Sequence, residues 1–332
     1  MPVFEATAPT RIDLAGGTLD IWPLYLFHPG AITLNVAIDR RALCRVRAGG
    51  EGVSIRSLDT GARHEARHVS EILAQAAPPL AAFVLQALGI EQGIEMSTQS
   101  RVPAGSGLGG SSALAVAIAA ATAAAFGRAQ APEAIWPLTR DAEARCLGVP
   151  AGIQDYLPAI YGGALAIHLE AGGVRLESLA LDFERVEQHL LLVDAGGTRF
   201  SGLNNWEIFK ARIDGDTRVR AALDAIASVA VRMRAALVAG RYEDVVALVA
   251  QEWATRKLLT PAITTPEIDR LVAIAEAAGG AGKACGAGGG GMVALWARGG
   301  EKASLEQALR GAGFSAAAFR IERSGLRVER ST

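Results

Sequence analysis

The residues best suited to chemistry form a run of glycine and serine from Gly105 to Ser112, GSGLGGSS, that leads into an alanine-rich apolar segment. Glycines in such a run reach positive φ and let a ligand approach the backbone. Free N–H groups and the dipole of a following helix attract an anion. Ser111 or Ser112 could cap that helix. We therefore expect an anion-binding loop that leads into a helix, since a plain turn needs fewer glycines and serines.

Two other nucleotide-binding motifs fit this segment poorly. Gly105, Gly107 and Gly110 match the G-x-G-x-x-G dinucleotide fingerprint. That fingerprint also needs an acidic residue about 20 residues further on, and residues 111–132 contain no Asp or Glu. The Walker pattern G-x-x-x-x-G-K-[ST] occurs nowhere in the chain. The segment alone thus indicates an anion loop of another kind.

The composition is that of an ordinary globular protein. Half of the 332 residues are hydrophobic, a fifth are charged, and the net charge is −1, with no basic stripe that would indicate nucleic acid or an anionic membrane surface. The longest nearly apolar run, residues 113–126, is shorter than the roughly 18 residues that cross a bilayer. The N-terminus has no signal-peptide pattern, so we expect a cytoplasmic enzyme. Cys44, Cys146 and Cys285 are scattered, which suits small buried side chains and no disulfide or metal site.

Patterning predicts the elements that must position the loop. Strands are expected at 3–8 and 11–14 (broken at Pro9), 31–46, 52–57, 93–100, 164–169, 189–193 and 292–296. Helices are expected at 73–88, with a boundary at Pro78 and Pro79, and at 113–126, 132–148, 226–238 and 266–278. Two successive sets of strands and helices predict an α+β chain of two domains, residues 1–184 and 185–332.

Three segments resemble, in order, the motifs of the GHMP kinases (galacto-, homoserine, mevalonate and phosphomevalonate kinases). They are PTRIDLAGG from Pro9, residues 102–113, and residues 283–292 with GAGGGG. The first is most similar to the sugar kinase branch, which contains fucose, heptose 7-phosphate and glucuronokinase-like enzymes. The resemblance implies an ATP-dependent kinase with an N-terminal domain like ribosomal protein S5 domain 2 and a ferredoxin-like C-terminal domain.

The resemblance also implies catalytic roles. Asp155, in Gly152-Ile153-Gln154-Asp155, matches the catalytic aspartate, which takes a proton from the acceptor hydroxyl. Arg11 matches the cation of the first motif, close to the transferring phosphoryl group. The alternatives are a loop aspartate that caps a turn and a strand arginine that faces solvent.

ATP and Mg²⁺ are the expected cofactors. Glu143 stands twelve residues before Asp155, the spacing at which galactokinases have a Mg²⁺ ligand, although Asp141 competes and an exposed helix position is the alternative. The hydroxyl partner is Ser111 or Ser112, with Ser112 preferred. The residues expected to bind ATP are Pro103, Gly105, Ser106, Gly107, Leu108, Gly109, Gly110, Ser111, Ser112, Gly288 and Gly289.

The residues expected to bind the acceptor are Gly17, Asp20, Gly289 and Gly290. Asp20 would accept hydrogen bonds from the hydroxyls of the acceptor, and the alternative is a turn aspartate that bonds its own backbone. Where galactokinases have Glu-His, this chain has Gly17-Thr18, which argues against galactose. The segment 194–210 could add Thr198, Arg199, Asn204 and Asn205, or it could be a surface loop in front of a helix.

The resulting hypothesis is a kinase that phosphorylates a hydroxyl of a hexose, heptose or uronic acid, with the anomeric hydroxyl as one candidate. A mevalonate-like or phosphomevalonate-like kinase is the alternative within enzymes. A catalytically inactive sugar or nucleotide sensor is the alternative outside them. The expected partner is a small sugar, with no nucleic acid and no membrane, and a homodimer is left open.

Overall fold

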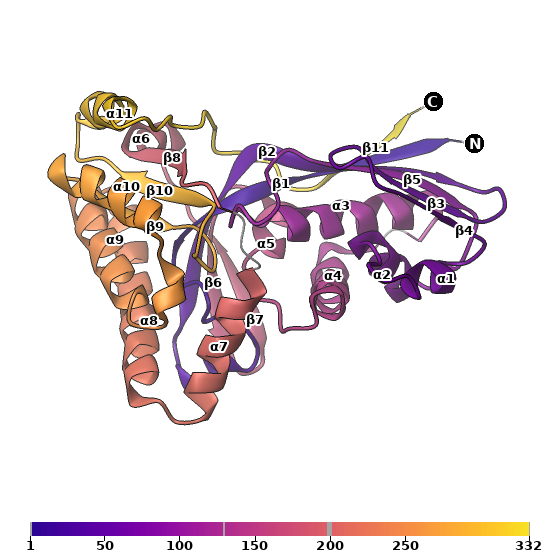
Figure 1. Ribbon diagram of the computed structural model, residues 1–332, viewed down its shortest axis with the longest axis horizontal. Helices are drawn as coiled ribbons and strands as arrows, with labels where there is room; N and C mark the ends of the chain where they lie inside the picture. The colour runs from indigo at the N-terminus through magenta and orange to yellow at the C-terminus, as the bar shows by residue number, and fades with distance from the viewer. Residues whose placement is uncertain (1, 129, 198–200, 332) are drawn as a thin grey trace.

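Two long antiparallel strands, β1 (Val3–Ala15) and β2 (Ile32–Ala48), run through the molecule (Figure 1). The structure is a computed structural model that describes residues 2–128, 130–197 and 201–331, without the side chains of 201–204. The two strands expected at 3–8 and 11–14 form the single strand β1, so the predicted break is wrong. The pairing register shifts between Pro9 and Thr10, and a bulge of this kind accommodates a residue without an N–H.

Strand β2 has different partners along its length. Residues 42–48 pair with β5 (Ile94–Ser100), and residues 32–36 pair with β6 (Ala164–Glu170). The rest of this sheet consists of β3 (Val53–Ser57), β4 (Arg63–Ala66), β7 (Gly173–Ser178) and β11 (Arg327–Ser331). β11 pairs with β1, so the end of the chain joins the sheet of the expected N-terminal domain.

Helix α3 (Gly110–Ala125) packs against β1 and β2 in the centre of the first part (Figure 1). Most of its buried positions are alanine, and these small side chains let the helix lie close to the sheet. Around it lie α1 (Val69–Leu73), α2 (Leu80–Ala87), α4 (Pro132–Leu147) and α5 (Tyr156–Tyr161). Of the helix expected at 73–88, residues 80–87 form α2, which begins after Pro78 and Pro79, whereas α1 ends at Leu73, where that helix was expected to begin.

A second sheet of three antiparallel strands lies at the other end of the molecule. Its order is β8 (Leu190–Asp194), β10 (Met292–Trp296) and β9 (Ala281–Ala284). The helices of this part are α6 (Phe183–His189), α7 (Ser201–Ile213), α8 (Thr217–Val238), α9 (Tyr242–Arg256), α10 (Pro266–Ala277) and α11 (Lys302–Gly311). Two 3₁₀ turns, η1 (Leu24–Phe27) and η2 (Pro261–Ile263), complete the elements. Helix α9 was not expected.

Apolar side chains from both sheets and from α8 and α9 form continuous clusters. The two parts therefore share core contacts. None of the described helices is long and apolar enough to cross a membrane.

The close packing of α3 can be tested at Ala117, which is fully buried. We expect Ala117→Leu to lower the free energy of unfolding by about 1–3 kcal/mol, because extra methylenes in a packed core force neighbouring groups apart. Denaturant unfolding measures this. The control is Ala235→Leu at an exposed position of α8, where a change within about 0.5 kcal/mol is expected. Equal effects at both positions would contradict tight packing under α3.

Candidate active site

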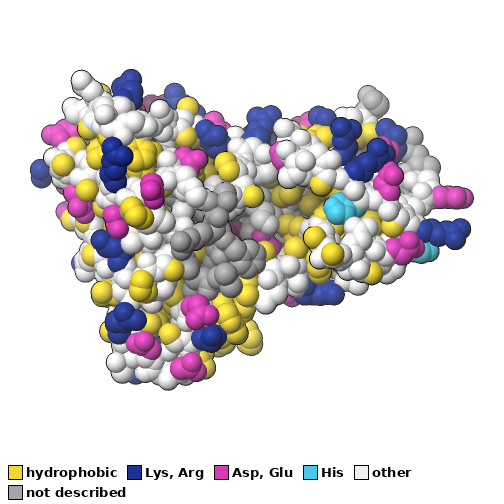
Figure 2. Space-filling view, in the orientation of Figure 1, with side chains coloured by type: hydrophobic (Ala, Val, Ile, Leu, Met, Phe, Trp, Pro, Cys, Tyr) yellow, Lys and Arg dark blue, Asp and Glu magenta, His cyan; other side chains and the backbone are white. Residues whose placement is uncertain are grey.

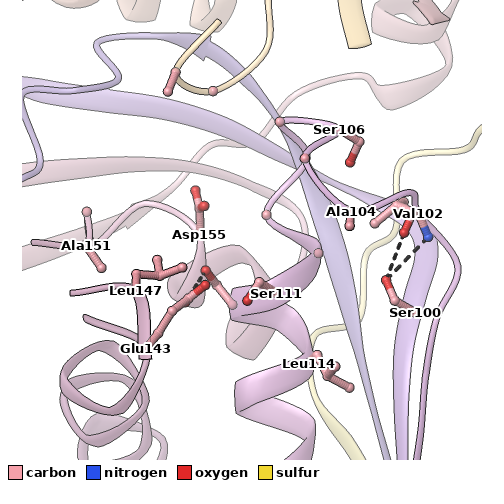
Figure 3. A pocket seen from close by; sticks show the side chains of 18 of the residues that line it. Ser100, Val102, Ala104, Ser106, Ser111, Leu114, Glu143, Leu147, Ala151 and Asp155 are labelled. Carbon is pink, nitrogen blue, oxygen red and sulfur yellow. Dashed lines mark hydrogen bonds between the residues drawn. The ribbon is translucent and has the colours of Figure 1, made fainter. Parts of the chain in front are cut away.

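One cavity of about 750 Å³ lies at the start of α3 and receives residues from both parts of the chain. Figure 3 shows Asp155, Glu143 and Ala151 on one side of it and Ser100 and Val102 on the other. The volume lies in the range of small-molecule sites, which hold about 300–1,000 Å³. The cavity has room for a nucleotide with a small second ligand.

The glycine-serine loop enters α3 in a left-handed turn. Gly109 precedes the helix with φ 71°, and no side chain caps the first turn. The expectation that Ser111 or Ser112 caps the helix is therefore wrong, because both lie inside the first turn. A Cβ at Gly109 would lie 3.2 Å from Cβ and Cγ of Asp155. Glycine thus allows both the turn and the contact with this carboxylate.

Arg11 and Asp155 form an ion pair beneath the loop. Arg11 is 2% exposed; its Nε donates to Oδ1 of Asp155 at 2.9 Å, and its Nη2 donates to the same oxygen. Nη1 of Arg11 donates to the carbonyl oxygen of Gly107, and the backbone N–H of Arg11 donates to that of Leu108 at 3.0 Å. Burial alone would lower the pKa of Arg11, but the charges of Asp155 and Asp13 raise it above its usual value. Arg11 is therefore a buried, permanent cation that joins the loop to Asp155, and it does not face solvent.

Glu143 and Ser112 meet at the same end of the cavity. The hydroxyl of Ser112 donates to Oε2 of Glu143 at 2.7 Å, and the hydroxyl of Tyr156 donates to the same oxygen at 2.5 Å. Burial raises the pKa of Glu143, although these hydrogen bonds act against the shift. Asp141, the competing candidate, is exposed and pairs with Arg140. Sequence reasoning missed Tyr156, although it directly follows Asp155.

Asp20 supports the segment that carries Asp155. Its Oδ2 accepts the N–H groups of Ile153 at 2.6 Å and Gln154 at 2.9 Å, and its carboxylate lines the cavity. A Cβ at Gly152 would lie 2.2 Å from this oxygen, so only glycine fits there. Burial raises the pKa of Asp20 to about 6, and the negative charge of Asp155 adds to this increase. The two backbone hydrogen bonds lower the pKa and so oppose the shift.

Most residues expected to bind ATP line the cavity: Pro103, Gly105, Ser106, Gly107, Gly109, Gly110, Ser111 and Ser112. Leu108 does not; it is buried in the core beneath the loop. In the third motif, Gly286 and Ala287 line the cavity in place of Gly288, Gly289 and Gly290. Gly289 lines a separate hollow near Thr265.

The third motif supports the glycine-serine loop from behind. The N–H of Met292 donates to the carbonyl oxygen of Ser106 at 2.9 Å. Gly17 also lies behind the cavity wall, against Asp13 and Arg256. Of the segment 194–210, Asn205 lines the cavity, and its Oδ1 accepts from the Thr18 hydroxyl at 3.4 Å. Thr198, Arg199 and the side chain of Asn204 lie outside the described residues.

Two family models match the chain. The GHMP kinases N terminal domain matches residues 73–163, and the GHMP kinases C terminal model matches residues 233–314. Together these segments make up slightly more than half of the chain. It belongs to the GHMP kinase family. The recognition of this family and of its two-part α+β fold from the sequence is thereby confirmed.

Two relatives of the chain are named as kinases of a sugar or a sugar phosphate. The chain is 27% identical over 222 residues to D-glycero-alpha-D-manno-heptose 7-phosphate kinase of Campylobacter jejuni, covering 65% of this chain and 64% of that protein. It is 26% identical over 320 residues to the bifunctional fucokinase/GDP-fucose pyrophosphorylase of Arabidopsis thaliana, covering 89% of this chain and 30% of that protein. The chain thus spans less than two thirds of the length of either relative.

Solved structures of GHMP kinases share the whole fold. A D-glycero-D-manno-heptose 1-phosphate kinase from Bacteroides thetaiotaomicron matches with a TM-score of 0.78 at 21% identity, over 99% of both chains. A mevalonate kinase matches with a TM-score of 0.74 at 20% identity, over 96% of this chain and 99% of that one. At these identities the likeness concerns the fold alone.

The buried state of Asp20 makes a prediction for stability. Because its pKa of about 6 in the folded chain exceeds the ordinary 3.8, the folded state binds the proton more tightly. The stability that Asp20 contributes is therefore present below pH 4 and is lost as the pH rises through 6. We expect the stability of Asp20→Asn relative to wild type to rise by about 2 kcal/mol from pH 4 to pH 7 and then to stay level. Denaturant unfolding across this range measures it, and a difference independent of pH would contradict the raised pKa.

Proposed function

We propose that this GHMP kinase is an ATP-dependent phosphotransferase that transfers the γ-phosphate to a hydroxyl group of a sugar. The observation that carries the proposal is the Arg11–Asp155 pair, which contacts the glycine-serine loop and lines the same cavity as the Ser112–Glu143 pair. Membership of the family supports ATP as the donor. Phosphoryl transfer needs little beyond positioning and charge stabilisation, and this cavity offers groups for both.

Asp155 is the proposed base. Its Oδ1 is held by Arg11, and within the described part of the chain no hydrogen bond reaches its Oδ2. The side chain is 27% exposed toward the cavity. An acceptor hydroxyl at hydrogen-bond distance from Oδ2 can pass its proton there as its oxygen forms the bond to phosphorus. Arg11 keeps the carboxylate in place against Gly109.

The residues at the start of α3 suit a magnesium ion. A hydroxyl and a carboxylate oxygen lie 2.7 Å apart. Burial destabilises the charged form of Glu143 and so raises its pKa, and a bound cation would offset that cost. Mg²⁺ takes few protein oxygens and completes its shell with phosphate and water. Ser112 and Glu143 would hold the ion, and Tyr156 would keep Glu143 oriented. When bound, the ion neutralises charge on the phosphate oxygens.

The two sides of the cavity suit the two substrates. The side formed by the ends of β3 and β5 has a mixed polar and apolar lining that would take the nucleoside: Ser57, Asp59, Thr60, Leu80, Ser100 and Val102. The other side presents hydrogen-bonding groups to the acceptor: Thr18, Asp20, Gln154 and Asn205. These neutral and acidic side chains can accept hydrogen bonds from several hydroxyl groups at once, which suits a polyol.

The acceptor class follows from the lining and the relatives. A heptose phosphate kinase and a fucokinase are the named activities of the relatives, which supports a hexose or heptose over mevalonate. The mevalonate-like alternative is supported only by the fold that the chain shares with a mevalonate kinase. An inactive sensor would not need Asp155, Glu143 and Ser112 together.

The deciding experiment measures ADP release with Mg-ATP against free sugars, uronic acids and heptose phosphates, with mevalonate as an outsider. We expect turnover with one sugar class. Asp155→Asn should abolish that turnover and change ATP affinity by no more than about threefold, because its carboxylate takes part in the chemistry and not in nucleotide binding. An Asp155→Asn enzyme with a near-normal rate would exclude this base, and turnover of mevalonate alone would favour the alternative.

The metal assignment is tested by two neighbouring serines. We expect Ser112→Ala to raise the Mg²⁺ concentration at half-maximal rate by about tenfold, since it removes one of two protein oxygens. Ser111→Ala, at an exposed position of the same turn, is the matched control. It should change the Mg²⁺ concentration at half-maximal rate only slightly. A shift in Ser111→Ala alone would move the ligand to that residue.

A further inference from the structure

A group of four buried charges lies behind the acceptor side of the cavity, outside the residues that line it. Asp13 on β1, Glu252 and Arg256 on α9, and Lys283 on β9 are all at most 1% exposed. Nζ of Lys283 lies 3.2 Å from Oδ2 of Asp13 and 3.3 Å from Oε1 of Glu252. Nη2 of Arg256 lies 3.1 Å from the same Glu252 oxygen and 3.7 Å from Oδ2 of Asp13. Two cations and two carboxylates balance one another.

The Asp13 carboxylate and the Arg256 guanidinium remain ionised. Burial raises the pKa of Asp13, but Lys283, Arg256 and Arg11 together lower it below its usual value. Burial lowers the pKa of Arg256, but Glu252 and Asp13 raise it above its usual value. Buried ion pairs often stabilise a fold no better than apolar residues of the same size. Stability alone is therefore a weak reason for the group.

Arg256 contacts the backbone around the cavity. Its Nη2 donates to the carbonyl oxygen of Gly17 at 3.0 Å. Its Nη1 donates to the carbonyl oxygen of Gly286 at 3.2 Å and lies 3.5 Å from the Thr18 hydroxyl. Gly286 and Thr18 line the cavity, and Arg256 does not. One guanidinium thus joins the loop after β1 to the third glycine motif, while Glu252 holds it from its own helix.

The loop that Arg256 holds leads directly to the base. Thr18 has φ 75°, a conformation unfavourable for a β-branched residue, and Asp20 follows two positions later. Asp20 in turn accepts the N–H groups of Ile153 and Gln154, which precede Asp155. A shift of Gly17 and Thr18 would therefore displace both Asp20 and the segment that carries Asp155.

We infer that Arg256 is a positioning residue for the acceptor: it holds the Gly17–Thr18 turn so that Asp20 and Asp155 face the acceptor hydroxyl. The inference rests on the proposed kinase function. It assigns to α9, which lies outside the three family-like motifs, a part in acceptor recognition. The ATP side has separate supports, among them the hydrogen bond from Met292 to Ser106, so the nucleotide should depend less on Arg256.

The test is Arg256→Lys, which keeps the charge and loses the fork of donors that reaches several groups at once. With the acceptor found for wild type, we expect kcat/KM for that acceptor to fall at least about tenfold, as for other small displacements of catalytic groups. The ATP dissociation constant measured without acceptor should stay within about twofold. If this variant does not fold, Glu252→Gln, which removes the charge that orients Arg256, is measured with the same expectation.

The control is Arg234→Lys. Arg234 on α8 donates two hydrogen bonds to Glu177 on β7 and so also joins the two parts of the chain, but it lies away from the cavity. We expect it to leave kcat/KM for the acceptor within about twofold even where the melting temperature falls. Equal losses of kcat/KM in both arginine variants, or an unchanged kcat/KM in Arg256→Lys, would overturn the inference. Failure of wild type on every acceptor would overturn the proposed function instead.

Discussion

The site depends on the burial of one permanent cation, Arg11. A guanidinium taken out of water needs its donors satisfied, and the fold does this with the Asp155 carboxylate and the carbonyl oxygen of Gly107. Residues 11, 107 and 155 are far apart in sequence. The requirement to pair this charge therefore holds the strand, the glycine-serine loop and the Asp155 segment in one arrangement.

The wall of the cavity next to Arg11 carries several carboxyl groups. Asp20, Glu143 and Asp155 all face one cavity, and burial raises the pKa of both Asp20 and Glu143. Such a wall is unfavourable for an empty protein and favourable for ligands that bring donors or a cation. Shifted carboxylates in a cleft are typical of functional sites for this reason. Hydroxyl donors and a divalent ion would both relieve the repulsion.

The second part of the molecule serves the site through its backbone and its buried charges. The third glycine motif lies against the loop at Ser106, and α9 brings Arg256 to Gly17 and Gly286. Both contacts are made to backbone carbonyl oxygens, so they position the loops whatever side chains the loops carry. The residues that hold the loops in place are therefore different from the residues that would contact the ligands.

Local patterns were sufficient for much of this chain. Alternation in residues 31–46 predicted β2, and the dense glycines and serines before an alanine-rich run predicted the loop and α3. These features depend on neighbours within a few residues. The resemblance to three motifs identified Arg11, Glu143 and Asp155 as candidate site residues. They lie too far apart in the sequence for any local pattern to connect them. α9 was missed even though Val245, Val246, Val249 and Trp253 have helical spacing.

Only the tertiary structure decided which of these residues meet. Pro9 was expected to end a strand, but pairing with β2 before and after Pro9 continues β1 through this residue with a shift in register. The last strand, β11, pairs with β1 at the edge of the first sheet. No sequence pattern near residue 327 indicates this partner, because β1 lies at the other end of the chain. Arg256 shows the limit most clearly. Its role depends on Gly17 and Gly286, which lie 239 and 30 positions away, so no spacing in the sequence could identify it. The sequence by itself determined the local elements and the reactive residue types, whereas long-range pairing of strands and buried charges decided the geometry.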